Sequence, residues 1–315
     1  MKCRNCKKKK FTLISKIGKQ PISSIFLKKK KYIENYSLDL FQCKFCDLVQ
    51  LSKIPSLKDM YGPQYGYKTS VSDLMVNHLK KKFNWIKRLK ILKKKPNVLD
   101  IGSNDGTFLN FFTKYDKRIN LIGMDPSANA FSGSYNKKIK VVVDFFKNQS
   151  VRKYLKDTKF SVITSFAMFY DVEDPNEFCK NISKVLEKNG IWILEFSYFP
   201  LLLKNLTYDQ ICHEHVVYYT LNTFNKILNR NNLKIVDFSL NEINGGSIEI
   251  ICTKKNSGLK IKQRKIKDII SKEKQISKSD YDRFNLRIQN GKNNLNLFLQ
   301  NINKSDIVGY GASTK

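Results

Sequence analysis

Short, almost continuously apolar runs alternate with longer segments of helical character through the middle of the chain. Apolar runs of strand length are typical of buried strands, and intervening helices place such strands parallel in one sheet. The five runs are "PNVLDI", "NLIGMD", "KIKVVVDFF", "KFSVITSFAMF" and "NGIWILEFS". The pattern therefore predicts an α/β fold with a doubly wound, mostly parallel sheet.

Two further apolar runs, "LKIVDFSL" and "SIEIICT", flank the short segment "NEINGG". Asn244, Gly245 and Gly246 suit a tight turn, because glycine and asparagine tolerate the backbone conformations that such turns need. These two strands are therefore expected to pair antiparallel at an edge of the sheet.

A tyrosine-rich loop, "YGPQYGYKTSVSDLM", precedes the sheet. It carries Tyr61, Tyr65 and Tyr67, which are packing residues unless a nearby site needs a phenol. Ser70 or Ser72 is expected to cap the helix that follows the loop. The apolar positions of this helix recur at helical spacing: Val71, Leu74, Met75, Leu79, Phe83, Ile86 and Leu89.

Composition indicates a globular protein. The chain has 315 residues, of which 41% are hydrophobic, so it is long enough for two domains with a buried core. No apolar run approaches the length of a membrane span, and "MKCRNCKKKK" lacks the apolar stretch of a secretory signal. We therefore expect a cytoplasmic protein without a membrane partner.

The net charge of +31 raises the question of a nucleic-acid partner. Lysine far outnumbers arginine, which is the better reader of bases and phosphates, and the lysines are spread over nearly every segment. The charge is therefore interpreted as compositional background and not as a nucleic-acid footprint. It would still attract an anionic substrate such as a nucleotide sugar.

Two Cys-x-x-Cys pairs lie near the amino terminus. Cys3 and Cys6 form the first pair, and Cys43 and Cys46 form the second, after a segment that reads as short strands and turns. Four thiolates from two such pairs satisfy tetrahedral zinc, and they leave no coordination position for water. A structural zinc ion is therefore predicted, the alternative being four unrelated buried cysteines.

A glycine loop follows the first strand of the predicted sheet. The strand over residues 97–101 ends in a loop that contains Gly102 and Gly106, and an apolar helix begins at Thr107 or Phe108. Glycines at these places let backbone approach a ligand at the carboxyl end of the strand, where open α/β sheets bind cofactors.

The residues around these glycines narrow the choice of cofactor. The third glycine of the dinucleotide fingerprint is absent; instead Asp100 precedes the first glycine, and Ser103 and Asn104 follow it. Asp125 ends the second strand about twenty residues later, where a carboxylate can accept hydrogen bonds from both ribose hydroxyls. This form resembles the first motif of class I S-adenosylmethionine-dependent methyltransferases.

That resemblance implies positions for further cofactor residues. Asp144 and Phe145 are expected near the adenine edge, although Asp144 could equally be a simple capping acid at a strand end. Ser165 to Ala167, at the end of the fourth strand, are expected to face the methyl donor. Methyltransferase sheets also finish with an antiparallel pair, which most dehydrogenase sheets do not.

The run "YDQICHEHVVYYTL" contains two of the three histidines of the chain. His213, Glu214 and His215 could bind a metal, but residues two apart seldom converge and no third ligand is evident nearby. A satisfied polar corner is a second interpretation. We favour acid–base chemistry, because a histidine with an ordinary pKa near 6.5 accepts a proton at neutral pH and an adjacent carboxylate can orient it or bind substrate.

Several motifs in order extend the resemblance over essentially the whole sequence. They are the paired knuckles with "DLVQL", then "YGYKTSVS", "LDIGSNDGTFL", "EDP", "HEHVVYYTL", "NGGS" and "GYGASTK". With these motifs the chain resembles the zinc-containing C-methyltransferases that act on nucleotide-linked keto-deoxysugars in bacterial sugar biosynthesis.

The resemblance implies S-adenosylmethionine as the cofactor and a carbon nucleophile. A base removes the proton beside a ketone of the nucleotide-linked sugar, and the enolate then attacks the methyl group. His215 corresponds to the base and Glu214 to a carboxylate that orients the substrate. Tyr65 or Tyr67 would supply a phenol near the reacting centre, and His213 would lie one layer behind.

Two positions depart from the family pattern. Cys212 stands where better-known members often have a tyrosine, and Asp171 stands where many have a histidine before the "DP" pair. Both positions are expected to touch the substrate, and Cys212 is therefore included among the candidate catalytic residues. The reaction type carries over to this chain, whereas the identity of the acceptor does not.

The resemblance also predicts three parts. They are a zinc-binding module with the tyrosine loop at 1–68, a methyltransferase domain at 69–257, and a lysine-rich helical linker at 258–315 that ends in the start of a C-terminal Rossmann-like domain. The sequence stops at a strand that lacks its crossover, so we expect it to be truncated. The alternative interpretations are an RNA methyltransferase and an inactive module that binds a nucleotide sugar.

Overall fold

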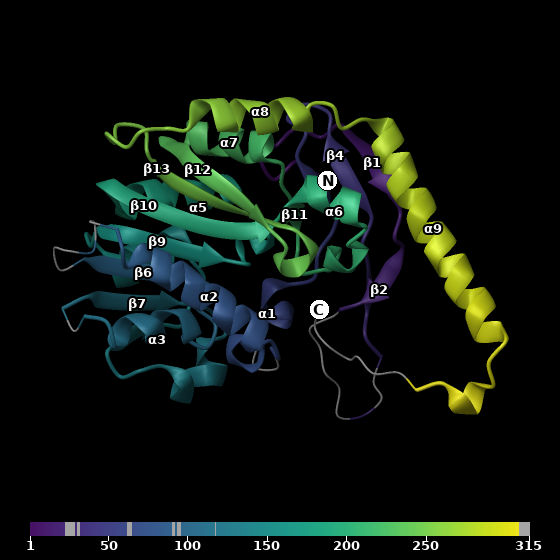
Figure 1. The fold of residues 1–315 in the computed structure, drawn as a ribbon, viewed down its shortest axis with the longest axis horizontal. Coiled ribbons are helices and arrows are strands. Elements are labelled where there is room, and N and C mark those ends of the chain that lie inside the picture. The colour runs from purple at the N-terminus through teal and green to yellow at the C-terminus, as the bar shows by residue number, and fades with distance from the viewer. Residues whose placement is uncertain are drawn as a thin grey trace.

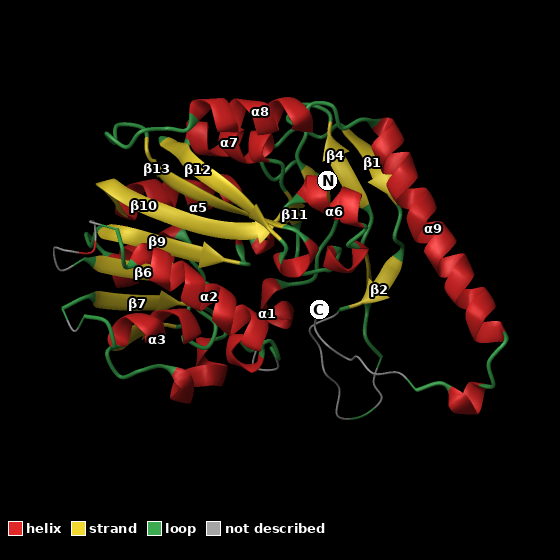
Figure 2. Ribbon diagram, in the orientation of Figure 1, coloured by secondary structure: helices red, strands yellow, loops and turns green. Residues whose placement is uncertain are grey.

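The chain folds into a central sheet with helices on both faces, a smaller amino-terminal sheet, and a long helix along the outer side of the smaller sheet (Figures 1 and 2). The computed structural model describes residues 1–22, 29, 32–61, 65–89, 92, 96–116 and 118–308. The strands are β1 (Phe11–Ser15), β2 (Lys19–Pro21), β3 (Asn35–Ser37), β4 (Leu40–Cys43), β5 (Val49–Leu51), β6 (Asn97–Ile101), β7 (Asn120–Met124), β8 (Ile139–Val142), β9 (Phe160–Phe166), β10 (Leu186–Ser197), β11 (Val217–Tyr218), β12 (Leu233–Asn241) and β13 (Ser247–Lys254). The helices are α1 (Leu57–Met60), α2 (Asp73–Ile86), α3 (Thr107–Thr113), α4 (Asn148–Ser150), α5 (Pro175–Val185), α6 (Phe199–Asn205), α7 (Leu221–Arg230), α8 (Gln263–Glu273) and α9 (Lys278–Gln300).

The central sheet has seven strands in the order β12-β13-β10-β9-β6-β7-β8. The five strands from β10 to β8 run parallel, while β13 pairs antiparallel with both β10 and β12. The predicted doubly wound sheet and its antiparallel edge are therefore confirmed. Gly245 and Gly246 have φ angles of 74° and 133°, which explains why glycines occupy the turn between the two edge strands.

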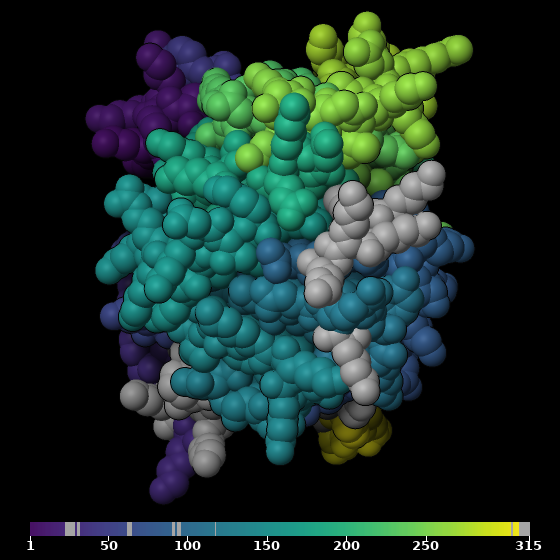
Figure 3. Space-filling view, turned by 90° about the vertical axis from the view of Figure 1, so that its left-hand side faces the viewer, coloured from purple at the N-terminus to yellow at the C-terminus, as the bar shows by residue number. Residues whose placement is uncertain are grey.

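Helices cover both faces of this sheet, as the doubly apolar strands require. In β9 six of seven residues are buried. On one face α2 and α3 pack against Val98, Leu121 and Val162. On the other face α5, α7 and α8 form the larger core. In the space-filling view of Figure 3, the yellow-green residues around α8 cover the upper edge of the molecule.

Helix α2 begins where the sequence predicts it, but its buried stripe is shorter. The side chain of Ser72 caps the helix by accepting a hydrogen bond from the backbone N–H of Met75. The prediction that Val71 and Leu74 belong to the apolar stripe is wrong, because both are exposed. Val71 lies in a 3-10 turn before the helix, so its side chain points elsewhere.

The amino-terminal sheet has four strands in the order β1-β4-β5-β11. Its first three strands come from the segment around the two cysteine pairs, as predicted. The fourth, β11, follows the His-Glu-His run and pairs with β5, where Val217 faces Gln50. The candidate catalytic turn is thus joined by backbone pairing to the cysteine module.

The two carboxyl-terminal helices pack on both modules. Glu273 of α8 accepts hydrogen bonds from the hydroxyl of Tyr198 and from the backbone N–H groups of Leu221 and Asn222, at the start of α7. Asn285 of α9 donates to the carbonyl of Ile14 in β1. None of the helices in the described part of the chain has the length and apolar character needed to cross a membrane.

The predicted boundaries at 68/69 and 257/258 stay predictions. The "GYGASTK" segment, at which a further domain is expected to begin, falls at 309–315 and lies outside the described residues.

Candidate functional site

A pocket of about 270 Å³ lies at the carboxyl ends of β6, β7, β8 and β9. The strand arrows of β6, β7 and β9 point toward the amino-terminal module (Figure 2). The residues that follow each of these strands form its floor, and the tyrosine loop forms part of its wall. Open parallel sheets bind ligands at this edge. The pocket is therefore the candidate site.

The glycine loop can approach a ligand because its backbone adopts conformations that favour glycine. Gly102 and Gly106 both have a φ angle of 76°. A Cβ atom on Gly102 would lie 2.7 Å from the side chain of Met168, and one on Gly106 would lie 2.5 Å from the ring of Tyr135. Gly102 lines the pocket, whereas Gly106 lies behind it and lets Tyr135 pack closely.

Asp125 holds the glycine loop against the second parallel strand. Its carboxylate accepts hydrogen bonds from the backbone N–H of Asn104 at 2.9 Å, and from the backbone N–H and hydroxyl of Ser127. Burial raises the pKa of Asp125. Asp100, which also lines the pocket, accepts from the hydroxyl of Thr164, and burial raises its pKa to about 7. Two buried carboxylates beside one glycine loop favour a ligand that brings hydroxyls and positive charge.

The glycine loop and the tyrosine loop are hydrogen-bonded to each other. The side-chain amide of Asn104 donates to the carbonyl of Tyr67, and its oxygen accepts from the backbone N–H and hydroxyl of Thr69. Asp105 accepts from the backbone N–H of Ser70. These bonds give a structural role to the asparagine and the aspartate of the glycine loop, and they hold the tyrosine loop beside the carboxyl end of β6.

Tyr135 closes the glycine loop from the other side. Its hydroxyl shares a hydrogen bond with the hydroxyl of Ser103 and donates to the carbonyl of Asn104. Ser103 lines the pocket with Asn104. Tyr135 carries no sequence signal of its role, because it lies more than twenty residues from the loop in an irregular segment.

The predicted adenine-edge residues line the pocket, and Asp144 also has a capping role. Asp144 accepts from the backbone N–H of Phe145 and from the hydroxyl of Ser150. At the end of β9, Phe166 and Ala167 line the pocket. Ser165 does not: it is fully buried, and its hydroxyl accepts a hydrogen bond from the indole N–H of Trp192. The alternation of side chains along β9 turns Ser165 to the opposite face from its neighbour Phe166.

The tyrosines of the loop gather beside acidic residues. The rings of Tyr61 and Tyr65 lie 5.3 Å apart, and Tyr61 meets the ring of Phe145 edge to face. Burial, and then the nearby charges of Glu214 and Asp171, hold the pKa of Tyr65 well above its usual range. Burial and the charge of Asp171 do the same for Tyr61. Both phenols therefore stay protonated at neutral pH and can donate hydrogen bonds.

The two histidines of the His-Glu-His run face different parts of the molecule. His215 packs its ring on Tyr170 at 3.9 Å, and its Nδ1 donates to the backbone carbonyl of Gln210 at 2.8 Å. His213 turns toward the amino-terminal module, where its Nε2 donates to the carbonyl of Tyr36. Both imidazoles are buried, and neither is among the described residues that line the pocket.

The turn that carries these histidines nevertheless lies close to the pocket wall. Tyr170 precedes Asp171, which lines the pocket, and the carbonyl of Tyr170 accepts from the backbone N–H of Val216. Burial, and then the charge of Asp171, hold the pKa of Tyr170 well above its usual range, and Glu214 acts in the same direction on Tyr65. Tyr65, Tyr67 and Asp171 line the pocket itself. The structure thus brings the tyrosine loop and the His-Glu-His turn close together. His215 of the turn packs on Tyr170, which is next to the lining residue Asp171.

The four paired cysteines converge in the amino-terminal module. The sulfurs of Cys3, Cys6, Cys43 and Cys46 all lie within 4.8 Å of one another. This spacing and an all-thiol donor set fit tetrahedral zinc, and three of the four residues are buried. These residues could hold the ion without help from the rest of the chain.

Comparison with family models divides the chain in a similar way. A model described as "Methyltransferase domain" matches residues 77–237, slightly more than half of the chain. One described as "Putative zinc binding domain" matches 3–61, and one described as "C-methyltransferase C-terminal domain" matches 242–315.

Among curated proteins, the chain is similar to the C-methyltransferase NovU of Streptomyces niveus. The two are 24% identical over 216 residues, which are 68% of this chain and 51% of NovU. The chain therefore spans about half the length of the curated relative that it matches.

Solved structures of low sequence identity are also similar. The PH0226 protein of Pyrococcus horikoshii is 16% identical with a TM-score of 0.46, and the match covers 60% of this chain and 94% of that one. The plantazolicin methyltransferase BpumL, in complex with a triazolic desmethylPZN analog and SAH, is 15% identical with a TM-score of 0.46. That match covers 59% of this chain and 87% of the BpumL chain.

Proposed function

Because the chain belongs to the methyltransferase domain family, whose model matches more than half of it, we propose that it transfers a methyl group from S-adenosylmethionine to carbon. The acceptor carbon lies beside a ketone of a nucleotide-linked sugar. The match of 242–315 to a C-methyltransferase C-terminal domain and the similarity to NovU support carbon as the acceptor atom.

The cofactor would lie on the glycine loop. Gly102, Ser103 and Asn104 offer backbone that a nucleoside can approach, and Asp125 is placed for the ribose hydroxyls. Phe145 offers an aromatic surface for the adenine. When bound, S-adenosylmethionine supplies an electrophilic methyl group on a positively charged sulfur.

His215 is the proposed base. Its Nδ1 must carry a proton, because the carbonyl of Gln210 can only accept a hydrogen bond. In the neutral ring the lone pair is then on Nε2, which takes the proton from the carbon beside the ketone. Since the ring is buried against Tyr170, the proposal requires this pair to open toward the pocket when the acceptor binds.

The protonated phenols of the tyrosine loop complete the proposed chemistry. Removal of the proton leaves an enolate, whose negative oxygen needs a hydrogen-bond donor. Tyr65 is suited to donate because burial and the neighbouring carboxylates keep its phenol protonated. The enolate carbon would then form the new bond to the methyl group that S-adenosylmethionine supplies, which would leave a neutral thioether. Tyr67 and Glu214 would orient the sugar.

Charge in the pocket limits which part of a nucleotide sugar can enter it. The described lining contains one lysine, Lys147. Its acidic residues are Asp100, Asp125, Asp144, Asp171, Glu173, Asp174 and Glu177. Carboxylates repel phosphate, so we place the sugar ring in the pocket and the diphosphate outside it. The same repulsion argues against a nucleic-acid backbone in this pocket.

The observation that carries the proposal is the set of hydrogen bonds between Asn104 of the glycine loop and Tyr67 and Thr69 of the tyrosine loop. These bonds hold the glycine loop and the tyrosine loop together at one pocket, which supports their proposed roles in cofactor binding and catalysis. The test is incubation with donor labelled in its methyl group and a panel of nucleoside-diphosphate keto-deoxysugars. Label transferred to one of these sugars supports the proposal, and label transferred only to RNA or to none of the panel contradicts it.

Asp125→Ala is expected to weaken the binding of S-adenosylhomocysteine by about tenfold to a hundredfold, the range for loss of hydrogen bonds to a charged group. The substitution removes the predicted ribose acceptor and releases the N–H of Asn104. Isothermal titration calorimetry measures the effect.

Asp144→Asn separates the two interpretations of Asp144 in the same binding measurement. A change in affinity within about threefold favours the capping role, and a loss of affinity like that of Asp125→Ala favours a cofactor contact.

The affinity for S-adenosylhomocysteine should rise with pH. Asp100 has a pKa of about 7 in the unliganded pocket, and a ligand that carries an ammonium group favours its ionised form. Binding therefore releases a proton, and the dissociation constant should fall by about tenfold between pH 6 and pH 8. In Asp100→Asn the dependence should vanish; an equally steep dependence in that variant would assign it to another group.

A further inference from the structure

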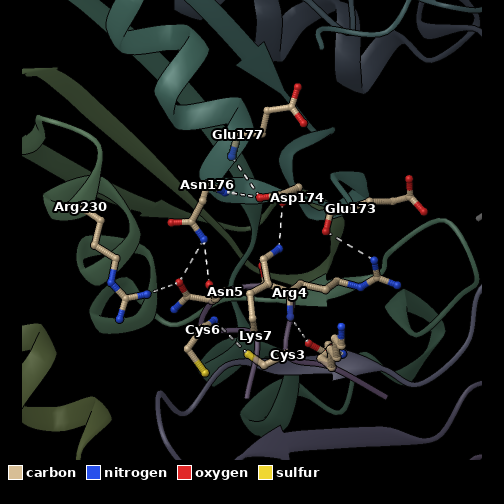
Figure 4. Close-up of polar contacts among 12 residues, drawn as sticks. Cys3, Arg4, Asn5, Cys6, Lys7, Glu173, Asp174, Asn176, Glu177 and Arg230 are labelled. Atoms are coloured by element: carbon tan, nitrogen blue, oxygen red, sulfur yellow. Dashed lines mark hydrogen bonds and ion pairs between the residues drawn. The ribbon is translucent and has the colours of Figure 1, made fainter. Parts of the chain in front are cut away.

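The residues between the first pair of cysteines face the methyltransferase domain (Figure 4). Arg4 and Asn5 lie between Cys3 and Cys6, and Asn5 is 4% exposed. A backbone turn joins the two cysteines, since the N–H of Lys7 donates to the carbonyl of Cys3. We call residues 3–7 the first knuckle.

Asn5 is bonded to two helices of the methyltransferase domain. Its side-chain oxygen accepts from the guanidinium of Arg230, at the end of α7, at 2.7 Å. The side-chain amide of Asn176, in the first turn of α5, donates to the carbonyl of Asn5 at 3.0 Å and more weakly to its side-chain oxygen. Asn231 donates in turn to Asn176. Asn5 thus connects the start of α5, through its backbone carbonyl and more weakly its side chain, to the end of α7, through its side chain.

The neighbours of Asn5 contact the segment that precedes α5. Arg4 donates to the carbonyl of Glu173 at 3.4 Å, and Lys7 forms an ion pair of 2.8 Å with Asp174. Asp174 caps α5 by accepting from the backbone N–H groups of Asn176 and Glu177. The knuckle therefore lies against both the cap and the first turn of α5.

This segment is also a wall of the pocket. Asp171, Val172, Glu173 and Asp174 all line the pocket, and the knuckle contacts two of them, Glu173 and Asp174. The wall continues into Tyr170, on which His215 packs. We call residues 170–177 the knuckle-facing wall.

We propose that Asn5 and Arg4 of the first knuckle are positioning residues for the knuckle-facing wall, so that the metal-held turn sets the acceptor side of the pocket. The ion would fix the backbone of Cys3 and Cys6, and thereby the two residues between them. This inference uses the proposed function only to identify the wall as the acceptor side; the contacts themselves are independent of it.

The contacts between the first knuckle and the methyltransferase domain differ in how much they can stabilise the knuckle-facing wall. Lys7 and Asp174 are both substantially exposed, and exposed ion pairs contribute little. Asn5 is buried, its partners are themselves bonded, and loss of a buried hydrogen bond leaves groups without a partner. Asn5 is therefore the residue to test.

The segment around the second cysteine pair, Cys43 and Cys46, offers a control contact. Lys226 of α7 forms an ion pair with Asp47, next to Cys46, and this contact also joins the cysteine module to α7. The polar partner of Lys226 is Asp47, which lies outside the knuckle-facing wall. Lys226→Ala thus removes one contact between the modules and leaves the wall untouched.

Hydrogen–deuterium exchange of the full chain, with one equivalent of zinc bound and no substrate, tests the proposal. In Asn5→Ala, exchange of the amides of residues 170–174, 176 and 177 is expected to rise about fivefold or more, the ratio for loss of a buried hydrogen bond. Lys226→Ala should match the parent protein. Asn5→Asp should restore protection, because its carboxylate accepts from Arg230 and the side-chain N–H group that it replaces has no partner among the described residues.

Unchanged exchange of the wall in zinc-loaded Asn5→Ala would overturn the proposal, and so would an equal rise in Lys226→Ala. If Asn5→Ala loses zinc, Arg230→Ala removes the same hydrogen bond from α7 and is judged by the same exchange criterion. Binding of S-adenosylhomocysteine should change by less than about twofold in Asn5→Ala, since the hydrogen bonds of Asn5 go to α5 and α7 and not to the glycine loop.

Kinetics give a second readout if a nucleoside-diphosphate keto-sugar of the panel is turned over. Asn5→Ala should then raise KM for that sugar about fivefold or more and leave kcat nearly unchanged. A loss confined to kcat would contradict a positioning role. If no sugar of the panel is turned over, the proposed function fails, whereas the exchange result still decides this inference.

Discussion

His215→Asn is expected to lower the rate of methyl transfer by about a hundredfold to ten-thousandfold, the usual contribution of a general base. Asparagine can keep a hydrogen bond to the carbonyl of Gln210, but it cannot accept a proton at neutral pH. Exchange of the proton beside the ketone should fall with methyl transfer, because both begin with the same step. The measurements are transfer of labelled methyl and solvent deuterium uptake into the sugar.

His213→Asn is the matched control for this substitution. It makes the same change two residues away, at a ring that faces Tyr36 of the amino-terminal module. Turnover should stay within about threefold of the parent, and S-adenosylhomocysteine should bind both variants normally. Deuterium uptake at the parent rate in His215→Asn would mean that another group is the base.

Removal of the predicted zinc ion is expected to have the largest effect on stability. Four thiolates from two distant pairs hold β1, β4 and β5 together, and structural zinc contributes on the order of 10 kcal/mol of folding free energy in small zinc domains. Chelation, or Cys43→Ser, should therefore unfold the amino-terminal sheet and release β11, its fourth strand. Thermal unfolding and circular dichroism measure the loss.

Cys252→Ser provides the control for the cysteine substitution. Cys252 is buried in β13, far along the chain from the four clustered thiols, so the variant should keep one equivalent of zinc. Elemental analysis gives the metal content of both variants. A parent protein that purifies without zinc, or a Cys43→Ser variant that keeps both its zinc and its stability, would contradict a structural metal site.

The central sheet was predictable because its strands carry strong local signals. β6 has the predicted bounds of residues 97–101, and Asp125 directly follows β7 as expected. Strands buried on both faces are almost continuously apolar, so their existence does not depend on knowing their partners. The clustering of the four cysteines was predictable for a similar reason, since thiol pairs at this spacing have few other uses in a chain.

Contacts between distant segments were not predictable from pattern. β11 has two residues and no periodicity, so its pairing with β5 leaves no trace in the sequence. The bonds of Asn104 to Tyr67 and Thr69 join two motifs that the sequence presents separately. Each motif could be recognised alone, but their mutual orientation depends on tertiary structure.

The direction of individual side chains was the other source of difference between the sequence-based predictions and the structure. Ser165 falls in a segment that does line the pocket, yet the two-residue period of β9 turns it toward Trp192. His215 lies beside the pocket wall as the motif suggests, but its ring is packed on Tyr170. A motif identifies which segment lies near a site, and the rotation of each residue is decided by packing around it.

The acidic lining of the pocket bears on the two departures from the family pattern. Asp171 adds a carboxylate beside Tyr61 and Tyr65, where a histidine would have added a proton acceptor or a positive charge. Cys212 removes one phenol from the same region. Both differences would change the hydrogen bonds available to the proposed sugar ring, and neither residue belongs to the glycine loop. We therefore expect the cofactor to be shared with the family and the acceptor to differ.

The position of the transferred methyl group tests the central claim most directly. The protein would be incubated with donor carrying a ¹³C-labelled methyl group and the nucleotide keto-sugar that is turned over, and the product examined by NMR. The account predicts a methyl signal coupled to the sugar carbon beside the ketone, with that carbon having lost a proton. A label attached to oxygen or nitrogen would contradict carbon methylation through an enolate.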